Sequence, residues 1–456
     1  MKKTILAWPF VLLAMLVFCA CGDDEETVLS SDCHISSFTL EGVKREIHTT
    51  SSTGEDSTYI VSYNASSYAM RINQLDGTIE NPDSLPRNTL KRAMLVTIET
   101  SGSVIYRKKD DAGENWMAYS STDSIDFNQT LVFRVVSADG SAWRDYFVDV
   151  NVHQQEGDEF VWKKLAEPGR WDDAEDLKTF VWNEKVWVFA RKGADVSLFS
   201  TGITGGTQWE EEELDGCGQA DIKTLTKFGG KLYMSGTDGS LMVSDDALVW
   251  VSVTTDCDNL RLLTADDAYL YAFAGQALWH SADGQHWTEE ELDAPADSLP
   301  VQDFVAVSYT QSDGLRKILL LGNRSVSEYE KDTHAMVWGR GTRTPTADAC
   351  WMYYEVSRDN RYACPRLSPL EVLRYGDSLL AFGGASIGGT VHGPLDAIYV
   401  SRDNGITWKS SGIYFLPDGV RNTQNVFAAT TDARNYLWLV TGRQVWRGRL
   451  NRYGFK

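Results

Sequence analysis

Tryptophan recurs at a similar place in several segments between residues 160 and 456, and this repeat limits the fold more than any other feature of the chain. The five copies are Trp209, Trp250, Trp287, Trp338 and Trp408, each in a short run that we expect to be the last strand of its unit. Upstream of each copy, apolar runs are separated by tight turns, as in TLTKFGGKLYMSG. Four strands per unit at a spacing of about 40 residues are typical of a β-propeller blade.

The last unit has only three of its four strands. Residues 425–450 contain three apolar runs, and then the pattern stops. The missing outer strand is found in EFVWKKL, residues 159–165, where Trp162 stands in the same context as the other tryptophans. Because a ring closed by both ends of the chain leaves no open sheet edge, we predict an all-β fold with a six-bladed propeller over residues 160–456, closed by the strand 160–165.

Three of the turns before these tryptophans share a serine, an aspartate and a tryptophan. The fullest copy is SRDNGITW, and the shorter copies are SADGQHW and SDDALVW, the last with Ala247 in place of glycine. Short Ser and Asp side chains hydrogen-bond to turn backbone, and glycine tolerates a positive φ. The pattern resembles the Asp-box of sialidases and related propellers, so Asp403 is expected to be a turn residue and no catalytic acid. The structural Asp-box residues are Ser244, Asp246, Trp250, Ser281, Asp283, Gly284, Trp287, Ser401, Asp403, Gly405 and Trp408.

A second folded unit is expected before the propeller. Residues 33–153 contain short alternating runs, such as AMLVTIET and QTLVFRVV, and no long run with helical periodicity. This pattern predicts a β-sandwich. It resembles the immunoglobulin-like or cadherin-like modules that follow the anchor in many surface lipoproteins. Residues 154–159 form the expected linker.

The first residues have the composition of an export signal. Two lysines and an apolar run make up residues 1–20, and Cys21 follows a small residue. This junction resembles the lipobox of bacterial lipoproteins, in which Cys21 is the lipidated residue. The acidic tether, residues 21–32, resembles the export signal of Bacteroidetes surface lipoproteins, and an ordinary signal peptide with a solvated tether is the alternative. The whole chain resembles uncharacterised two-domain surface lipoproteins of gut Bacteroidetes, which implies an outer-membrane location facing the cell exterior.

The charge of the chain excludes polyanionic partners. Its formal net charge of −21 becomes −23 once Lys2 and Lys3 leave with the signal. A chain this acidic is repelled by nucleic acid and by anionic lipid headgroups. We therefore expect no nucleic-acid partner, and contact with the membrane through the lipid anchor only.

Two insertions lie on the propeller face opposite the Asp-box turns, where propellers usually bind their ligands. They are residues 344–369, expected to join blades four and five, and residues 385–397, inside blade five. Aromatic faces and guanidinium groups suit sugars, carboxylates or a protein partner. The alternative is that these side chains pin a long loop onto the propeller. The candidate ligand-binding residues are Trp351, Tyr353, Tyr354, Arg358, Arg361, Tyr362, Arg366 and His392.

The cysteines and histidines predict neither a metal site nor a cofactor. Five cysteines remain after processing, and no C-x-x-C pair occurs. A disulfide between Cys350 and Cys364 would close one long loop, and buried free thiols are the alternative. The histidines lack the spacing of a two-ligand helix and are expected to be structural or exposed.

A catalytic function has to be considered, because the propellers that the Asp-box turns resemble include sialidases. Those enzymes hold the substrate carboxylate with three arginines, the first in an R-I-P motif before the first Asp-box. Between residues 159 and 200 the only arginines are Arg170 and Arg191, and neither belongs to such a motif. We therefore predict no catalytic residues and a propeller that binds a glycan or protein ligand at the cell surface. The alternatives are a propeller glycoside hydrolase and a structural component of an envelope complex.

Overall fold

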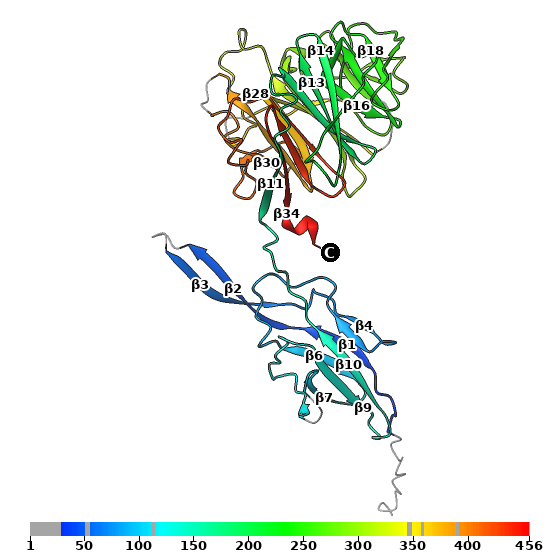
Figure 1. Ribbon diagram of the computed structural model, residues 1–456, viewed down its shortest axis with the longest axis vertical. Coiled ribbons are helices and arrows are strands. Elements are labelled where there is room, and N and C mark those ends of the chain that lie inside the picture. The colour runs from blue at the N-terminus through cyan, green and yellow to red at the C-terminus, as the bar shows by residue number, and fades with distance from the viewer. Residues whose placement is uncertain are drawn as a thin grey trace, which may run out of the picture. The chain divides into compact units, whose positions relative to one another are not determined.

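The computed structural model describes residues 29–50, 55–111, 115–343, 349–356, 360–388 and 392–455. The signal residues, Cys21 and Arg358 lie outside these ranges. The chain divides into two all-β units, one ending at Glu156 and the other spanning Gly157–Phe455 (Figure 1). In the part of the chain that is described, no helix has the length and apolar character needed to cross a membrane.

The described residues of the N-terminal unit form ten strands in three sheets. Its largest sheet has the order β4-β5-β10-β9-β7-β8, and the pairs β1-β6 and β2-β3 form the other two. Apolar residues of β9 and β10 alternate inward, so that Phe133 and Tyr146 face each other in a buried core. The strands are β1 (Ile35–Leu40), β2 (Gly42–Thr50), β3 (Asp56–Asn64), β4 (Arg71–Asn73), β5 (Thr78–Glu80), β6 (Val96–Thr100), β7 (Ser103–Lys108), β8 (Met117–Ala118), β9 (Leu131–Val136) and β10 (Trp143–Asp149).

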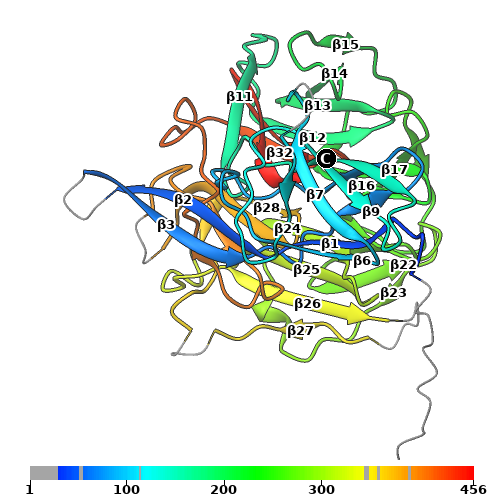
Figure 2. The same cartoon turned by 90° about the horizontal axis from the view of Figure 1, so that it is seen from below.

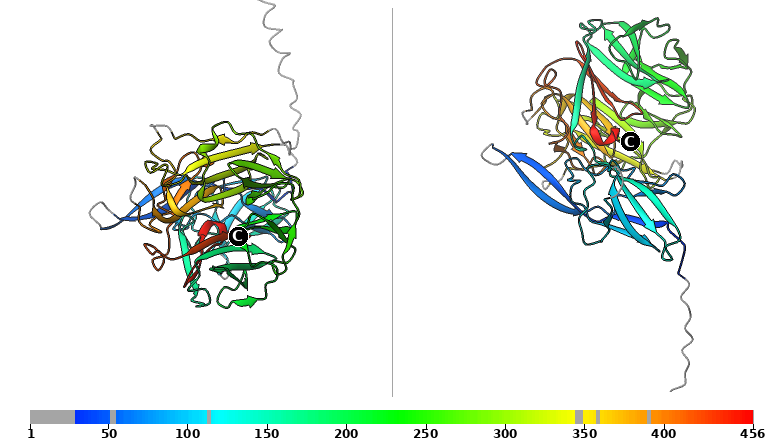
Figure 3. Two further views of the ribbon diagram at one scale, coloured as in Figure 1. Left: turned by 90° about the horizontal axis from the view of Figure 1, so that it is seen from above. Right: turned by 60° about the horizontal axis from the view of Figure 1, so that its bottom comes forward.

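The second unit is a β-propeller of six four-stranded sheets. Figure 2 shows the inner strands around its middle and outer strands such as β15 and β27 toward the edge, and Figure 3 gives two further views. The strands of blades one to three are β12 (Asp176–Trp182), β13 (Lys185–Lys192), β14 (Asp195–Gly202), β15 (Glu210–Glu212), β16 (Ala220–Phe228), β17 (Lys231–Gly236), β18 (Leu241–Ser244), β19 (Val251–Val253), β20 (Arg261–Ala265), β21 (Leu270–Ala274), β22 (Ala277–Ser281) and β23 (Thr288–Glu289). Those of blades four and five are β24 (Gln302–Thr310), β25 (Arg316–Asn323), β26 (Met336–Thr342), β27 (Met352–Tyr353), β28 (Leu367–Tyr375), β29 (Ser378–Ser386), β30 (Tyr399–Ser401) and β31 (Lys409–Ser410).

Both ends of the propeller unit contribute to its sixth blade. This sheet has the order β11-β34-β33-β32, from β11 (Phe160–Ala166), β34 (Val445–Leu450), β33 (Leu437–Thr441) and β32 (Phe427–Thr431). The outer strand β11 pairs antiparallel with β34. Its buried aromatic residue is Phe160, which packs edge-on against Tyr375 and Tyr414. Trp162 is only partly buried and donates its indole N–H to the Phe415 carbonyl.

The Asp-box turns are held by hydrogen bonds within each turn. In blade five, Ser401 Oγ donates to Asp403 and accepts the N–H of Gly405 at 2.8 Å. The carboxylate of Asp403 also accepts the N–H and the hydroxyl of Thr407, and the indole of Trp408 donates to the Gly405 carbonyl. Gly405 has a φ of 90°, and the corresponding Gly284 and Ala247 are also in the left-handed region. All carboxylate oxygens of Asp403 thus face turn donors, which is a structural role.

The blade-four tryptophan is Trp351 rather than Trp338, which corrects the repeat alignment. In four other blades a buried tryptophan immediately precedes the outer strand, as Trp287 precedes β23. Trp351 has this place before β27 and is fully buried, whereas Trp338 lies on the third strand, β26. The predicted insertion of residues 344–369 is therefore interrupted by β27, and only its second part joins blades four and five.

Candidate functional site

The inner strands of the propeller surround a pocket of about 600 Å³. It is lined by the first half of β12 and β28, where the chain enters the blade, by most of β24, and by nearly the whole length of β16 and β20. Connections between blades and loops after second strands lie at the same end, and the loop residue Thr237 belongs to the lining. The pocket therefore lies at the propeller face expected to bind ligands, but at its centre rather than over blades four and five.

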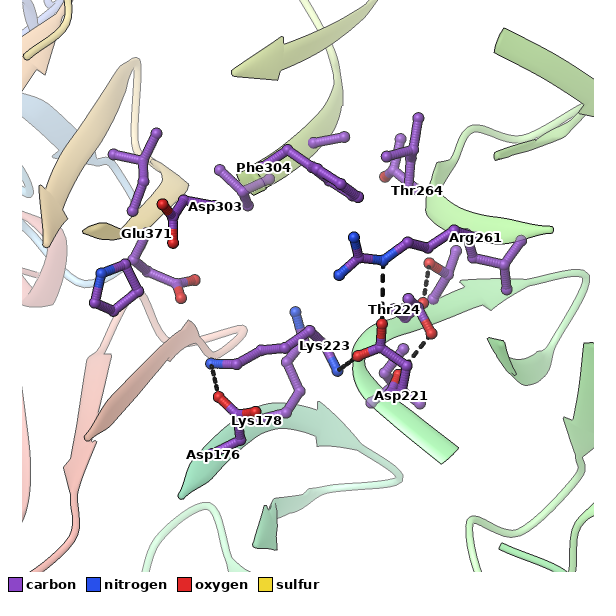
Figure 4. A pocket seen from close by; sticks show the side chains of 18 of the residues that line it. Asp176, Lys178, Asp221, Lys223, Thr224, Arg261, Thr264, Asp303, Phe304 and Glu371 are labelled. Atoms are coloured by element: carbon purple, nitrogen blue, oxygen red, sulfur yellow. Dashed lines mark hydrogen bonds and ion pairs between the residues drawn. The ribbon is translucent and has the colours of Figure 1, made fainter. Parts of the chain in front are cut away.

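Charged side chains enter the pocket because of the alternation within the inner strands. In β12 and β16 the sequences Asp-Leu-Lys and Asp-Ile-Lys place the aspartate and the lysine on the channel side and the apolar residue between them in the core. Figure 4 shows these side chains converging from different blades. The charged lining residues are Asp176, Lys178, Arg191, Asp221, Lys223, Lys227, Arg261, Asp303 and Glu371.

Three of the lining strands are irregular where they meet the pocket. The pairing register shifts in β16 between Asp221 and Thr226, in β20 between Leu262 and Thr264, and in β24 between Gln302 and Val305. In β24 the shift coincides with Asp303, whose φ of 50° is unusual for a residue other than glycine. Such bulges re-aim side chains and are over-represented beside binding and active sites.

Two of the four carboxylates that line the pocket are already paired with cations from a neighbouring strand or blade. Asp176 pairs with Arg191 and lies 3.8 Å from Lys223 Nζ, which also donates to the Leu177 carbonyl. Asp221 lies 3.1 Å from Arg261 Nε. These pairs tie blades one, two and three together and fix the shape of the opening.

Lys178 and Glu371 are different, because neither side chain has a hydrogen bond or ion pair within the described residues. Desolvation lowers the pKa of Lys178, and the nearby Glu371 carboxylate opposes that shift. Desolvation also raises the pKa of Glu371, opposed by Lys178 and Lys223. Two ionisable groups without committed partners therefore face the same pocket.

A smaller, more apolar pocket of about 280 Å³ adjoins the central one. Arg261 and Phe304 line both pockets, and the guanidinium carbon of Arg261 lies 4.4 Å from the centre of the Phe304 ring. Phe304 also contacts Phe273 edge-on at 5.0 Å. The mouth thus combines charged groups, hydroxyls and one aromatic face.

Two of the residues predicted to bind ligand are part of the interior. Trp351 is fully buried and contacts Tyr271. Arg366 is also fully buried, and its guanidinium donates to the carbonyls of Arg324, Tyr329 and Asp332. Both are closed to a ligand, because Trp351 is buried in the cluster between blades three and four and the Arg366 guanidinium is taken up by backbone carbonyls of residues 324–332.

The other predicted residues do not form one surface. Tyr353 and Tyr354 are partly buried in different core clusters. Arg361 and Tyr362 are exposed, although the Tyr362 carbonyl accepts the backbone N–H of Trp408. His392 is partly buried and contacts the Tyr399 hydroxyl at 2.9 Å. Arg358 lies outside the described residues, and none of the other five side chains lines the central pocket.

The predicted disulfide is absent, and both cysteines are free thiols. Cys364 is buried in the cluster between blades four and five, whereas Cys350 adjoins Trp351 in the cluster between blades three and four. Strand β27 lies between the two cysteines in the sequence and separates these environments. Burial raises the pKa of the Cys364 thiol, which keeps it protonated.

The sequence contains a pattern that indicates the central pocket, although the tryptophan repeat does not reveal it. Aligning the inner strands, rather than the tryptophans, places Asp176 with Asp221 and Lys178 with Lys223. Charged residues at alternate positions of otherwise apolar inner strands indicate a polar channel.

Fold and site together define a β-propeller with a charged central pocket, preceded by a second β-rich unit. The chain belongs to the DUF6242 family. Residues 156–456 match the "DUF6242 beta propeller domain", and residues 38–150 match the "Domain of unknown function (DUF6242) N-terminal domain". A search of curated proteins finds no significant match.

Several solved structures are similar to the chain at low identity. A structure of YCF48 bound to D1 peptide is 13% identical with a TM-score of 0.38, over 64% of this chain and 96% of that chain. An α-L-arabinanase from Penicillium chrysogenum complexed with arabinobiose is 13% identical with a TM-score of 0.40, over 64% and 98%. A DUF4623 family protein from Bacteroides eggerthii is 10% identical with a TM-score of 0.35, over 90% and 98%.

Proposed function

We propose that the propeller is a binding module that holds a glycan in its central pocket without catalysis. The observation that carries this proposal is the pair of uncommitted groups, Lys178 and Glu371, facing a pocket of about 600 Å³. Pockets of 300 to 1,000 Å³ are the usual size for small ligands. Such a pocket admits one or a few sugar rings but no folded protein.

The chemistry of the lining favours a hydroxyl-rich ligand. The hydroxyls of Thr264 and Ser308 line the pocket and have no side-chain hydrogen bond within the described residues. Sugar hydroxyls both donate and accept, so they match a wall that mixes hydroxyls, ammonium groups and carboxylates. The Phe304 ring offers an apolar face for a sugar ring.

A glycoside hydrolase is the second candidate, and one observation favours it. Glu371 and Asp303 both line the pocket, and desolvation raises the pKa of Glu371. Glycosidases use two carboxyl groups, one of them a general acid with a raised pKa. Release of sugar from any glycan that binds would replace the binding proposal with this one.

The binding proposal is tested by Glu371→Ala with Tyr362→Ala as its matched control. We expect Glu371→Ala to weaken binding to glycans selected on an array by roughly ten-fold or more, because hydrogen bonds to charged groups contribute about 1.5–3 kcal/mol. Tyr362→Ala removes an exposed side chain of the blade-five region and should leave affinity unchanged. Isothermal titration calorimetry gives the dissociation constants of both variants, and release of sugar by hydrolysis is followed in the same samples.

Two outcomes contradict the proposal. If no glycan on the array binds, the structural component of an envelope complex becomes the preferred function. If Tyr362→Ala abolishes binding and Glu371→Ala does not, the ligand lies on the exposed loop and the central pocket is excluded.

We also propose that the chain is a surface lipoprotein in which an immunoglobulin-like N-terminal unit separates the propeller from the membrane. The sequence LVFCA-Cys21 and the acidic residues after it support this location. Replacing Cys21 with serine should move the protein from the membrane fraction to the soluble fraction, because the acylated thiol is lost. Immunoblots of the two fractions measure the change, and a variant that stays on the membrane contradicts the lipid anchor.

A further inference from the structure

The central pocket carries more positive charge than the rest of this acidic chain. The chain has a formal net charge of −21, yet five cationic side chains line the pocket against four carboxylates. Two of the carboxylates, Asp176 and Asp221, are neutralised by ion pairs. A third, Asp303, accepts the side-chain amide of Asn323. The lining as a whole therefore has a formal charge of +1, which favours an anionic ligand more than the acidic chain around it does.

Lys178 is the cation in this pocket that remains available. The other cations are held, since Lys223 donates to the Leu177 carbonyl, Lys227 donates to the Val181 carbonyl, and the two arginines pair with aspartates. Lys178 has no such partner within the described residues, and Figure 4 shows its side chain reaching toward the middle of the pocket. The nearby Glu371 carboxylate offsets part of the cost of desolvating this ammonium group but forms no hydrogen bond or ion pair with it, so the ammonium N–H groups can donate to a ligand.

We propose that the ligand is an acidic saccharide whose carboxylate binds Lys178, an inference that rests on the proposed glycan-binding function. One uncommitted ammonium group matches the single charge of a uronic acid. A doubly charged phosphate ester fits less well, because the arginine forks that suit phosphate are paired and because Asp303 and Glu371 face the same space. The free hydroxyls of Thr264 and Ser308 are placed to bind sugar hydroxyls.

This assignment also predicts how the empty protein behaves. A lysine kept for folding would be paired, and its loss would destabilise the propeller. Lys178 is desolvated and makes no side-chain hydrogen bond or ion pair, and Glu371 keeps Lys223 as a nearby cation, so replacing Lys178 with the apolar, similarly long methionine should leave the ligand-free melting temperature equal to or above that of the wild type. The change in melting temperature therefore distinguishes the two roles. It is negative if Lys178 is a structural residue, and zero or positive if Lys178 is a binding residue.

The experiment compares acidic sugars with neutral sugars of the same shape. The probes are short oligosaccharides of galacturonic and glucuronic acid, and the matched controls are the corresponding uronamides, which keep every hydroxyl. We expect the full chain to bind at least one acid ten-fold or more tightly than its uronamide by calorimetry. Lys178→Met should reduce the ratio of the two dissociation constants, uronamide over acid, to near one. The control Lys192→Met, which removes an exposed lysine paired with Asp173 outside the pocket, should keep it.

The remaining outcomes overturn the inference in distinguishable ways. If neutral and acidic sugars bind equally tightly, the glycan-binding function stands and the role of Lys178 fails. The same holds if Lys178→Met keeps the ratio, or if it lowers the melting temperature by several degrees. If no sugar of either kind binds, the glycan-binding function and the inference fail together.

Discussion

Replacing Phe160–Ala166 with a Gly-Ser segment of equal length is expected to abolish the folded propeller. The segment is strand β11, which pairs with β34 from Phe160 opposite Leu450 to Ala166 opposite Val445. The change removes this ladder and leaves β34 as an open edge. It also removes Phe160 from its cluster, and loss of a buried phenylalanine alone costs about 3–5 kcal/mol. The total is comparable with the whole stability of a domain, about 5–15 kcal/mol.

Thermal unfolding monitored by near-ultraviolet circular dichroism measures this effect, since the tryptophans report on the propeller. Two point variants of the same strand serve as controls. Phe160→Ala should lower the melting temperature strongly, whereas Val161→Ala, at a side chain that is 47% exposed, should change it little. A replaced segment that melts like the wild type would mean that β11 is not needed to close the ring.

Breaking the buried ion network between blades three and four is expected to have the next largest effect. Glu290 lies 2.7 Å from Arg340 Nε and 2.6 Å from His280 Nδ1, and the side chains of Glu290 and Arg340 are each 1% exposed. Glu290→Ala leaves the Arg340 charge buried and unpaired, and Arg340→Ala leaves the buried Glu290 carboxylate with His280 alone beside it. Such changes cost about 3–5 kcal/mol. Urea unfolding gives the free energy of unfolding of each variant.

The double variant Glu290→Leu with Arg340→Met distinguishes the cost of losing the ion pair from the cost of leaving one buried charge without its partner. Because both charges leave together, we expect it to recover most of the stability lost in the single variants. The exposed pair of Arg343 and Asp313 is the matched control, and Arg343→Ala should cost less than about 1 kcal/mol. Single variants of the buried pair that behave like this control would contradict the prediction.

The tryptophan repeat and the turn patterns were sufficient to predict a β-propeller. Each strand is defined by residues within a few positions of one another, and each Asp-box closes on itself, as the bonds from Asp403 to Thr407 illustrate. Such short-range rules act within one blade, so they can be recognised without knowing where the other blades lie.

Blade four is where these rules failed. Trp338 and Trp351 are both fully buried, and both follow apolar residues or short side chains, so their sequence contexts do not distinguish a third strand from an outer one. Residues between β26 and β27 lengthen the connection and shift the repeat. Trp351, predicted to bind ligand, is therefore a buried structural residue of its blade.

The sequence by itself determined the strands, the turns and the division into two β-rich units, because alternation and turn chemistry depend on neighbouring residues. Only the tertiary structure decided the candidate site. Lys178 and Glu371 belong to blades one and five, and closure of the ring brings their side chains to one pocket. Whether a charged residue of an inner strand finds a partner depends on which blades flank it. For this reason Asp176 and Asp221 are paired and Lys178 is not.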